Sequence, residues 1–115
     1  MAYQASLSRM SFVYEALPMR VVFGSGTRSA LPEEIARLGI SRALILHGQS
    51  HAAVHQELKQ ALGERYAGAF DGARMHTPVD VTDTAMKRVA ELGVDGIVAL
   101  GGGSTTGLSK AIALR

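Results

Sequence analysis

Short apolar runs alternate along the chain with segments in which apolar residues recur at helical spacing. Three nearly continuous runs rich in Val, Ile and Leu lie at residues 20–23, 43–46 and 96–100, and weaker runs lie near 12–14 and 67–70. A short apolar run that does not alternate with polar residues indicates a strand buried on both faces. The pattern therefore predicts three buried strands and two weaker ones.

Four further segments have the apolar spacing of amphipathic helices. Pro32 suits the first turn of the first segment, and Glu33 and Glu34 stand where the helix dipole favours negative charge. Asp80 is the predicted N-cap of the third segment. The apolar positions of the first three are Leu31, Ile35 and Leu38; Val54, Leu58, Ala61 and Leu62; and Val81, Ala85, Val89 and Leu92, and the fourth segment covers residues 104–114.

Three of the predicted helices end at a glycine. Gly39, Gly63 and Gly93 each follow a leucine, at the position where a left-handed C-cap needs glycine. Strands that alternate with helices are typical of a parallel sheet covered on both faces. The sequence therefore predicts an α/β fold in one domain over residues 12–115, with a disordered lead-in at 1–11. Because an apolar helix runs directly to Arg115, we expect the domain to be truncated.

The composition fits a globular chain and excludes several classes of protein. Of the 115 residues, 47% are hydrophobic and 19% are charged, which is too apolar for a disordered chain. Lys and Arg are scattered singly, without the basic stripe of a nucleic-acid surface, and no apolar run is long enough to span a membrane. Cysteine is absent, which excludes disulfides and thiolate ligands. We expect a cytoplasmic protein with a small-molecule substrate.

A run of three glycines follows the last apolar strand. Gly101, Gly102, Gly103 and Ser104 join residues 96–100 to the final helix. Consecutive glycines let a ligand approach the backbone closely, and the free N–H groups of a new helix favour an anion such as phosphate. Ser104 is expected to cap the helix or to donate its hydroxyl to a phosphate oxygen. A tight strand-to-helix corner is the alternative, but three glycines at the carboxyl end of a buried strand favour phosphate binding.

Residues 101–114, Gly-Gly-Gly-Ser-Thr-Thr-Gly-Leu-Ser-Lys-Ala-Ile-Ala-Leu, resemble the cofactor loop of the iron-containing alcohol dehydrogenase superfamily, whose pattern is GGGS-x-x-D-x-x-K. Gly107 stands where most members have Asp, and the run Thr-Thr-Gly-Leu is similar to that of the maleylacetate reductase branch. Residues 12–26 and 70–79 agree with the same branch. The resemblance covers residues 12–115.

This resemblance implies a Rossmann-like dinucleotide-binding domain, followed in relatives by a helical domain absent from this chain. It implies NAD or NADP as cofactor, a homodimer, and NAD(P)H-dependent reduction of maleylacetate to 3-oxoadipate in the degradation of aromatic compounds. Residues that catalyse or hold a metal in relatives fall in the missing part, so the catalytic residues are unknown and the chain alone is expected to be inactive. The positions that carry over as pyrophosphate binders are Gly101, Gly102, Gly103 and Ser104, with Thr105 and Thr106 as neighbours of the phosphates or ribose.

The segment after the strand at 43–46 departs from many relatives, which have Asp where Gly48 falls, to hold the adenosine ribose. A carboxylate there repels a 2′-phosphate, so its absence leaves NAD and NADP both open, with Gln49 or Ser50 at the ribose edge. Two alternative functions remain. One is another iron-type alcohol or glycerol dehydrogenase, against which Gly107 argues, and the other is a non-catalytic fragment that binds nucleotide or a partner chain.

His47, His51 and His55 recur every four residues, a spacing that can place metal ligands on one helix face. His47 is expected to end the strand instead, and a histidine pair without a third ligand makes a weak site. We therefore predict no metal site in this chain. His76 is expected in a loop near the cleft, with no assigned role.

Overall fold

The computed structural model describes residues 11–16, 19–74 and 78–115. The chain forms two compact units, which meet in sequence between Glu34 and Ile35. Apart from Ser11, the lead-in predicted at residues 1–11 lies outside the described residues, as does His76. Within the described residues, no helix combines the length and apolar character needed to cross a membrane.

The first unit contains a two-stranded antiparallel ribbon. β1 (Phe12–Ala16) pairs with β2 (Met19–Phe23), so that Phe12 lies opposite Phe23 and their rings stack at a centroid distance of 5.0 Å. The prediction that residues 20–23 form a strand buried on both faces is wrong. Only two residues separate the two strands in sequence, which is too few for the crossover that parallel pairing needs. The unit continues through η1 (Thr27–Ala30) into α1 (Leu31–Arg37).

The second unit contains a three-stranded parallel sheet in the order β4-β3-β5. β3 (Ala43–Leu46) is the central strand, and β4 (Tyr66–Phe70) and β5 (Gly96–Ala99) flank it. The connection from β3 to β4 contains η2 (Gln49–His51), α2 (Ala52–Leu62) and η3 (Gly63–Arg65). The connection from β4 to β5 contains α3 (Val79–Leu92), and α4 (Gly103–Ala113) follows β5. The predicted α/β class with a parallel sheet is confirmed.

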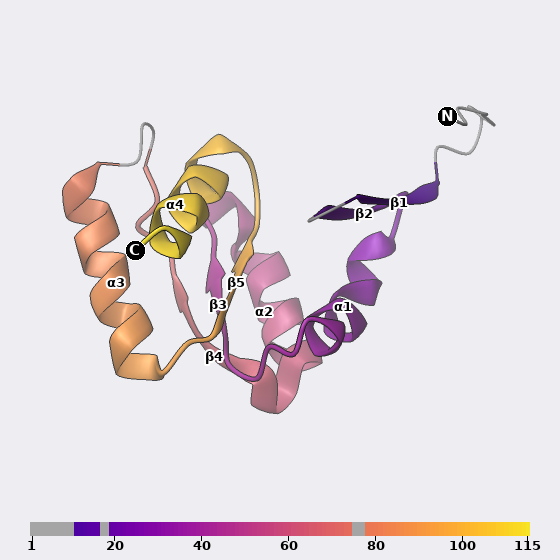
Figure 1. Ribbon diagram of the computed structural model, residues 1–115, viewed down its shortest axis with the longest axis horizontal. Coiled ribbons are helices and arrows are strands. Elements are labelled where there is room, and N and C mark those ends of the chain that lie inside the picture. The colour runs from indigo at the N-terminus through magenta and orange to yellow at the C-terminus, as the bar shows by residue number, and fades with distance from the viewer. Residues whose placement is uncertain (1–10, 17–18, 75–77) are drawn as a thin grey trace. The chain divides into compact units, whose positions relative to one another are not determined.

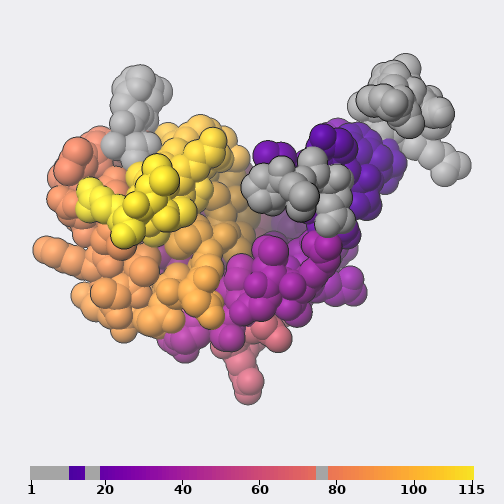
Figure 2. Space-filling model, in the orientation of Figure 1, coloured from indigo at the N-terminus to yellow at the C-terminus, as the bar shows by residue number. Residues whose placement is uncertain are grey.

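The two faces of the sheet carry different helices. The chain crosses from β3 to β4 through α2 and returns past β3 to β5 through α3, in the opposite direction. Right-handed crossovers in opposite directions place their helices on opposite faces, and Figure 1 shows α2 and α3 on either side of the sheet. Because α4 packs with α3, as the yellow and orange segments of Figure 2 show, these two helices share one face.

The central strand carries most of the core. All four residues of β3 are fully buried, as predicted, whereas in β5 only Val98 is buried and Ala99 is exposed. The predicted burial of β5 on both faces is therefore wrong, because within the described residues β3 alone pairs with it. The core cluster between the sheet, α3 and α4 consists of Leu44, Leu46, Val81, Ala85, Leu108 and Ile112.

The helix ends confirm the predicted caps only in part. Gly39 and Gly93 have φ values of 75° and 64°, in the left-handed region expected of a C-cap glycine. Gly63 has a ψ of −120° and instead begins η3. The prediction of Asp80 as an N-cap is wrong, because the Pro78 carbonyl already accepts the first helical N–H bonds and Asp80 lies inside the first turn.

Candidate functional site

The site lies where the helices after two neighbouring strands leave the sheet on opposite faces. β3 and β5 are adjacent and parallel, α2 follows β3 on one face, and α4 follows β5 on the other. Open α/β sheets bind their ligands at such a switch point, in the crevice outside the carboxyl ends of the strands. The glycine turn and the segment after β3 both belong to this edge of the sheet.

The glycine turn is held to the sheet at its start. The Leu100 N–H donates to the Leu46 carbonyl at 2.8 Å, so pairing between the strands continues up to the turn. Gly101 then has a φ of 115°, which side chains rarely adopt, and a Cβ there would lie 3.3 Å from His51 Cε1. The positive φ therefore favours glycine at this position, and the neighbouring ring leaves little room for a side chain.

Gly102 and Gly103 differ from Gly101 in what their surroundings require. Neither residue has a positive φ, and a Cβ on either one would meet no atom within 4 Å. Packing within the chain therefore leaves room for side chains at both positions. This open space lies beside the first N–H groups of α4, which have no partner within the helix and favour an anion. The geometry fits a phosphate group against the bare backbone.

Thr105, rather than Ser104, stabilises the turn. Its hydroxyl is buried and lies 3.0 Å from the Leu100 carbonyl and 3.2 Å from the Gly102 carbonyl, to which it donates. The expected capping role of Ser104 is wrong, because Gly102 is the N-cap and no side chain caps the helix. Ser104 is partly exposed and Thr106 exposed near the start of α4, whereas the Thr105 side chain points into the fold.

The segment after β3 meets the glycine turn through His51. Gly48 has no atom within 4 Å of a Cβ position, and Gln49 and Ser50 are exposed. The Ser50 hydroxyl lies 3.1 Å from His51 Nδ1, and the same ring lies beside Gly101, where it would be 3.3 Å from an added Cβ. The structure therefore brings Gly48, Gln49 and Ser50 to the same edge of the sheet as the glycine turn; their predicted contact with the cofactor stays a prediction.

Two of the three histidines form a buried pair that their spacing did not indicate. His47 directly follows β3, and its ring stacks on His55 at a centroid distance of 4.4 Å with an interplanar angle of 14°. His55 Nε2 lies 2.8 Å from the Tyr66 hydroxyl. The sequence carried no local signal for this pair, because it depends on how α2 packs against the end of β3. Among the residues that the structure describes, no three His, Cys, Asp or Glu side chains are grouped to hold a metal; the predicted lack of a metal site stays a prediction.

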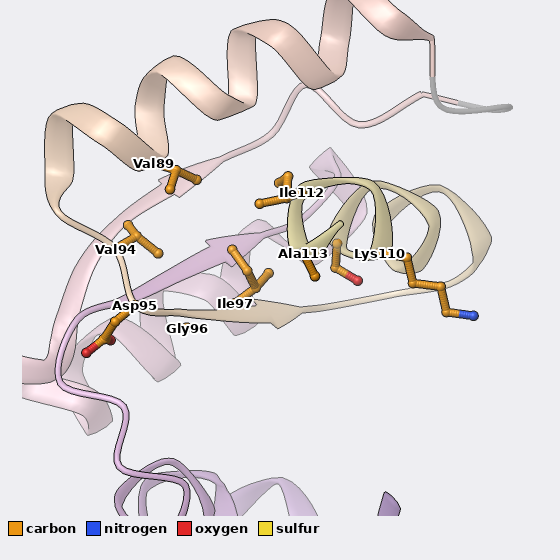
Figure 3. Close-up of a pocket in the computed structure, with 9 residues that line it drawn as sticks. Val89, Val94, Asp95, Gly96, Ile97, Lys110, Ile112 and Ala113 are labelled. Atoms are coloured by element: carbon orange, nitrogen blue, oxygen red, sulfur yellow. The ribbon is translucent and has the colours of Figure 1, made fainter. Parts of the chain in front are cut away.

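An apolar groove of about 470 Å³ lies between α3, α4 and β5, away from the glycine turn. Val89, Val94, Ile97 and Ile112 line it, and Lys110 directs its ammonium group away from these side chains (Figure 3). The groove offers few polar groups to orient a ligand, so the glycine turn remains the stronger candidate site.

Comparisons with known proteins agree with this geometry. Maleylacetate reductase of Rhizobium sp. (strain MTP-10005) is 51% identical over 104 residues, which cover 90% of this chain and 30% of that protein. The crystal structure of maleylacetate reductase from Agrobacterium tumefaciens has a TM-score of 0.82 at 52% identity, over 90% of this chain and 30% of that one. Sulfoacetaldehyde reductase from Bifidobacterium kashiwanohense, solved in complex with NAD⁺, has a TM-score of 0.71 over 77% of this chain and 24% of that one; at 20% identity it shows the fold alone.

The chain thus spans about three tenths of the length of the curated relatives it matches. The sequence profile of the family described as iron-containing alcohol dehydrogenase matches residues 18–115. That match covers most of the chain, and the Rossmann-like fold of the solved relatives agrees with the parallel sheet. The chain therefore belongs to the iron-containing alcohol dehydrogenase family.

Proposed function

We propose that this chain is the NAD(P)H-binding part of a maleylacetate reductase. The observation that carries the proposal is the glycine turn at the switch point between β3 and β5, in a chain whose relatives bear that name. The complete enzyme reduces the carbon–carbon double bond of maleylacetate to give 3-oxoadipate, in the breakdown of aromatic compounds. The backbone N–H groups of Gly102, Gly103 and Ser104 bind the pyrophosphate, and Gly101 gives the turn its shape.

The other predicted cofactor contacts divide into two roles. The buried Thr105 hydroxyl holds the turn by donating to its backbone carbonyls. Thr105 therefore contributes to cofactor binding through its backbone only. Thr106 is exposed at the start of α4 and is available to a phosphate or ribose oxygen. Gly48, Gln49 and Ser50 form the adenosine side of the site.

The chain accepts NADH and NADPH alike. Residues 47–51, His-Gly-Gln-Ser-His, contain no carboxylate to repel a 2′-phosphate. The open space at Gly48 also leaves room for that phosphate. Both features support binding of either cofactor at the same edge of the sheet.

The chemistry is divided between the cofactor and the protein. A bound nicotinamide supplies the hydride, and this chain binds and orients it. The catalytic groups belong to a helical domain outside this chain, which accounts for relatives about three times as long. The chain by itself therefore binds cofactor without turnover.

Titration of the 115-residue chain with NADH and with NADPH, followed by nicotinamide fluorescence, tests the proposal. We expect saturable binding of both, with dissociation constants within about tenfold of each other. Addition of maleylacetate to the chain is expected to cause no oxidation of NADH. Lack of binding by the folded chain would refute the cofactor site. Maleylacetate-dependent oxidation of NADH would refute the proposal that the catalytic groups lie outside this chain.

We further propose that the protein is a cytoplasmic homodimer associated through the β1–β2 ribbon. Val13, Tyr14 and Met19 are 58%, 52% and 60% exposed, and two-stranded ribbons have unpaired edges that accept further strands. Val13→Lys is expected to shift the sedimentation coefficient from dimer to monomer. Leu114→Lys, at an exposed apolar position of the second unit, is the control and leaves the dimer intact. Equal effects of both changes would place the interface elsewhere.

A further inference from the structure

Beneath this edge of the sheet lies a polar row formed by the buried His47 and His55 and the half-buried Tyr66. The His47 and His55 side chains come from residues that are only 7% and 9% exposed, and their rings are nearly parallel. Tyr66, at the start of β4, fixes His55 through the 2.8 Å hydrogen bond to Nε2. Burial of polar side chains is costly unless their hydrogen bonds are specific. The row therefore defines the orientation of the His47 ring.

The His47 ring in turn contacts the backbone of the segment after β3. Its Nδ1 lies 3.0 Å from the Gly48 carbonyl oxygen, and a carbonyl only accepts, so Nδ1 carries the hydrogen and donates it. The same carbonyl accepts the His51 N–H at 3.0 Å. One donor precedes Gly48 in the sequence and the other follows it, and together they fix the direction of the Gly48 carbonyl group.

Fixing this carbonyl also fixes the amide that follows it. The Gly48 carbonyl and the Gln49 N–H belong to one planar peptide, and in a trans peptide the two groups point in opposite directions. The Gln49 N–H therefore points away from the polar row. Gln49 begins η2, where an N–H has no partner within the helix, and its residue is exposed.

We propose that His47, held by His55 and Tyr66, is a positioning residue that presents the Gln49 N–H as a donor to the adenosine side of the bound dinucleotide. The proposal rests on the cofactor site proposed above, because it assigns the ligand of that amide. The groups that the dinucleotide offers there are ribose hydroxyl oxygens or, in NADPH, 2′-phosphate oxygens. His47 itself contacts no ligand.

Burial favours the neutral forms of both His55 and Tyr66. Burial, together with the nearby His47 and Lys59, lowers the pKa of His55, which favours its neutral form. Burial raises the pKa of Tyr66 against the opposing effect of Arg88, so the phenol keeps its hydrogen. The Lys59 ammonium lies over the Tyr66 ring, 5.5 Å from its centroid.

The first measurement is the tautomer of His47, read from long-range ¹H–¹⁵N correlation of the imidazole nitrogens in the 115-residue chain at pH 8. We expect the hydrogen on Nδ1. The Nε2–H form, which leaves nothing to donate to Gly48, would overturn the proposal. This readout needs no cofactor and does not depend on the proposed function.

The second measurement compares two substitutions of the same residue. His47→Asn keeps an amide nitrogen near the position of Nδ1, whereas His47→Gln places it near Nε2. We expect His47→Gln to weaken NAD⁺ binding by about fivefold to tenfold, the value of one neutral hydrogen bond, and His47→Asn to stay within about twofold of the unsubstituted chain. Calorimetric titration gives both dissociation constants, and thermal unfolding shows that both variants are folded.

The outcomes separate this inference from the cofactor site. Equal affinities of the two variants would overturn the positioning role while leaving the site itself in place. If the unsubstituted chain binds neither NAD⁺ nor NADH, the cofactor site fails. The Gln49 amide ¹⁵N shift then decides the positioning role, because a fixed peptide predicts a change in His47→Gln but not in His47→Asn.

Discussion

Gly102→Asp is expected to raise the dissociation constant of NADH by a factor on the order of a hundred or more, while the chain remains folded. A carboxylate about 4 Å from a phosphate is repelled by roughly 4 kcal/mol at the effective dielectric constant of a protein surface. A Cβ at Gly102 would meet no atom within 4 Å, so packing within the chain leaves room for the new side chain. Fluorescence titration measures the affinity, and thermal unfolding measures the fold.

The control for this substitution is Gln60→Glu, which alters the net charge by the same amount on an exposed position of α2. It is expected to change the affinity by less than about twofold, because solvent and salt screen a distant surface charge. Undiminished NADH binding by Gly102→Asp would mean that the pyrophosphate lies away from the glycine turn.

The largest loss of stability is expected from Leu108→Ala. Leu108 is fully buried between α4 and the sheet, in the cluster that contains Leu44 and Leu46. Removal of such a side chain leaves a cavity and lowers the free energy of unfolding by about 2–5 kcal/mol. Urea unfolding followed by circular dichroism measures this difference.

Leu114→Ala is the matched control, since the same atoms are removed from a residue that is 88% exposed. Its free energy of unfolding is expected to change by no more than about 0.5 kcal/mol. Because α4 begins at the glycine turn, Leu108→Ala is also expected to weaken NADH binding. Similar losses of stability for the two leucine variants would show that α4 does not pack on the core.

The sheet of the second unit was predictable from the sequence because its signals are local. The continuous apolar run of β3, the helix ends at Gly39 and Gly93, and the glycine turn each specify their own conformation within a few residues. The two segments of the candidate site lie close together because β3 and β5 are neighbours, which the alternation of strands and helices allows but does not specify. The glycine turn was therefore easier to predict than its position beside His51.

The errors arose where a tertiary contact decides the outcome. β2 carries the same apolar pattern as a buried parallel strand, yet its nearness in sequence to β1 selects an antiparallel ribbon. Ser104 and Thr105 both have hydroxyls at the start of a helix, and only the direction of the turn determines which one points inward. The His47–His55 pair depends on the helix α2 packing beneath the end of β3, which no local spacing indicates.

Gly101 has a positive φ, whereas Gly102 and Gly103 do not. The three positions should therefore respond differently to selection for folding and to selection for binding. In a randomised library screened only for soluble expression, Gly101 should persist, because its φ of 115° excludes most side chains. Gly102 and Gly103 should vary more readily in the same screen, since neither has a positive φ and nothing in the chain occupies their Cβ positions. If the glycines at those two positions persist in a screen for NADH binding, they are kept for the ligand, and a search of the folded chain for clashes does not reveal that requirement.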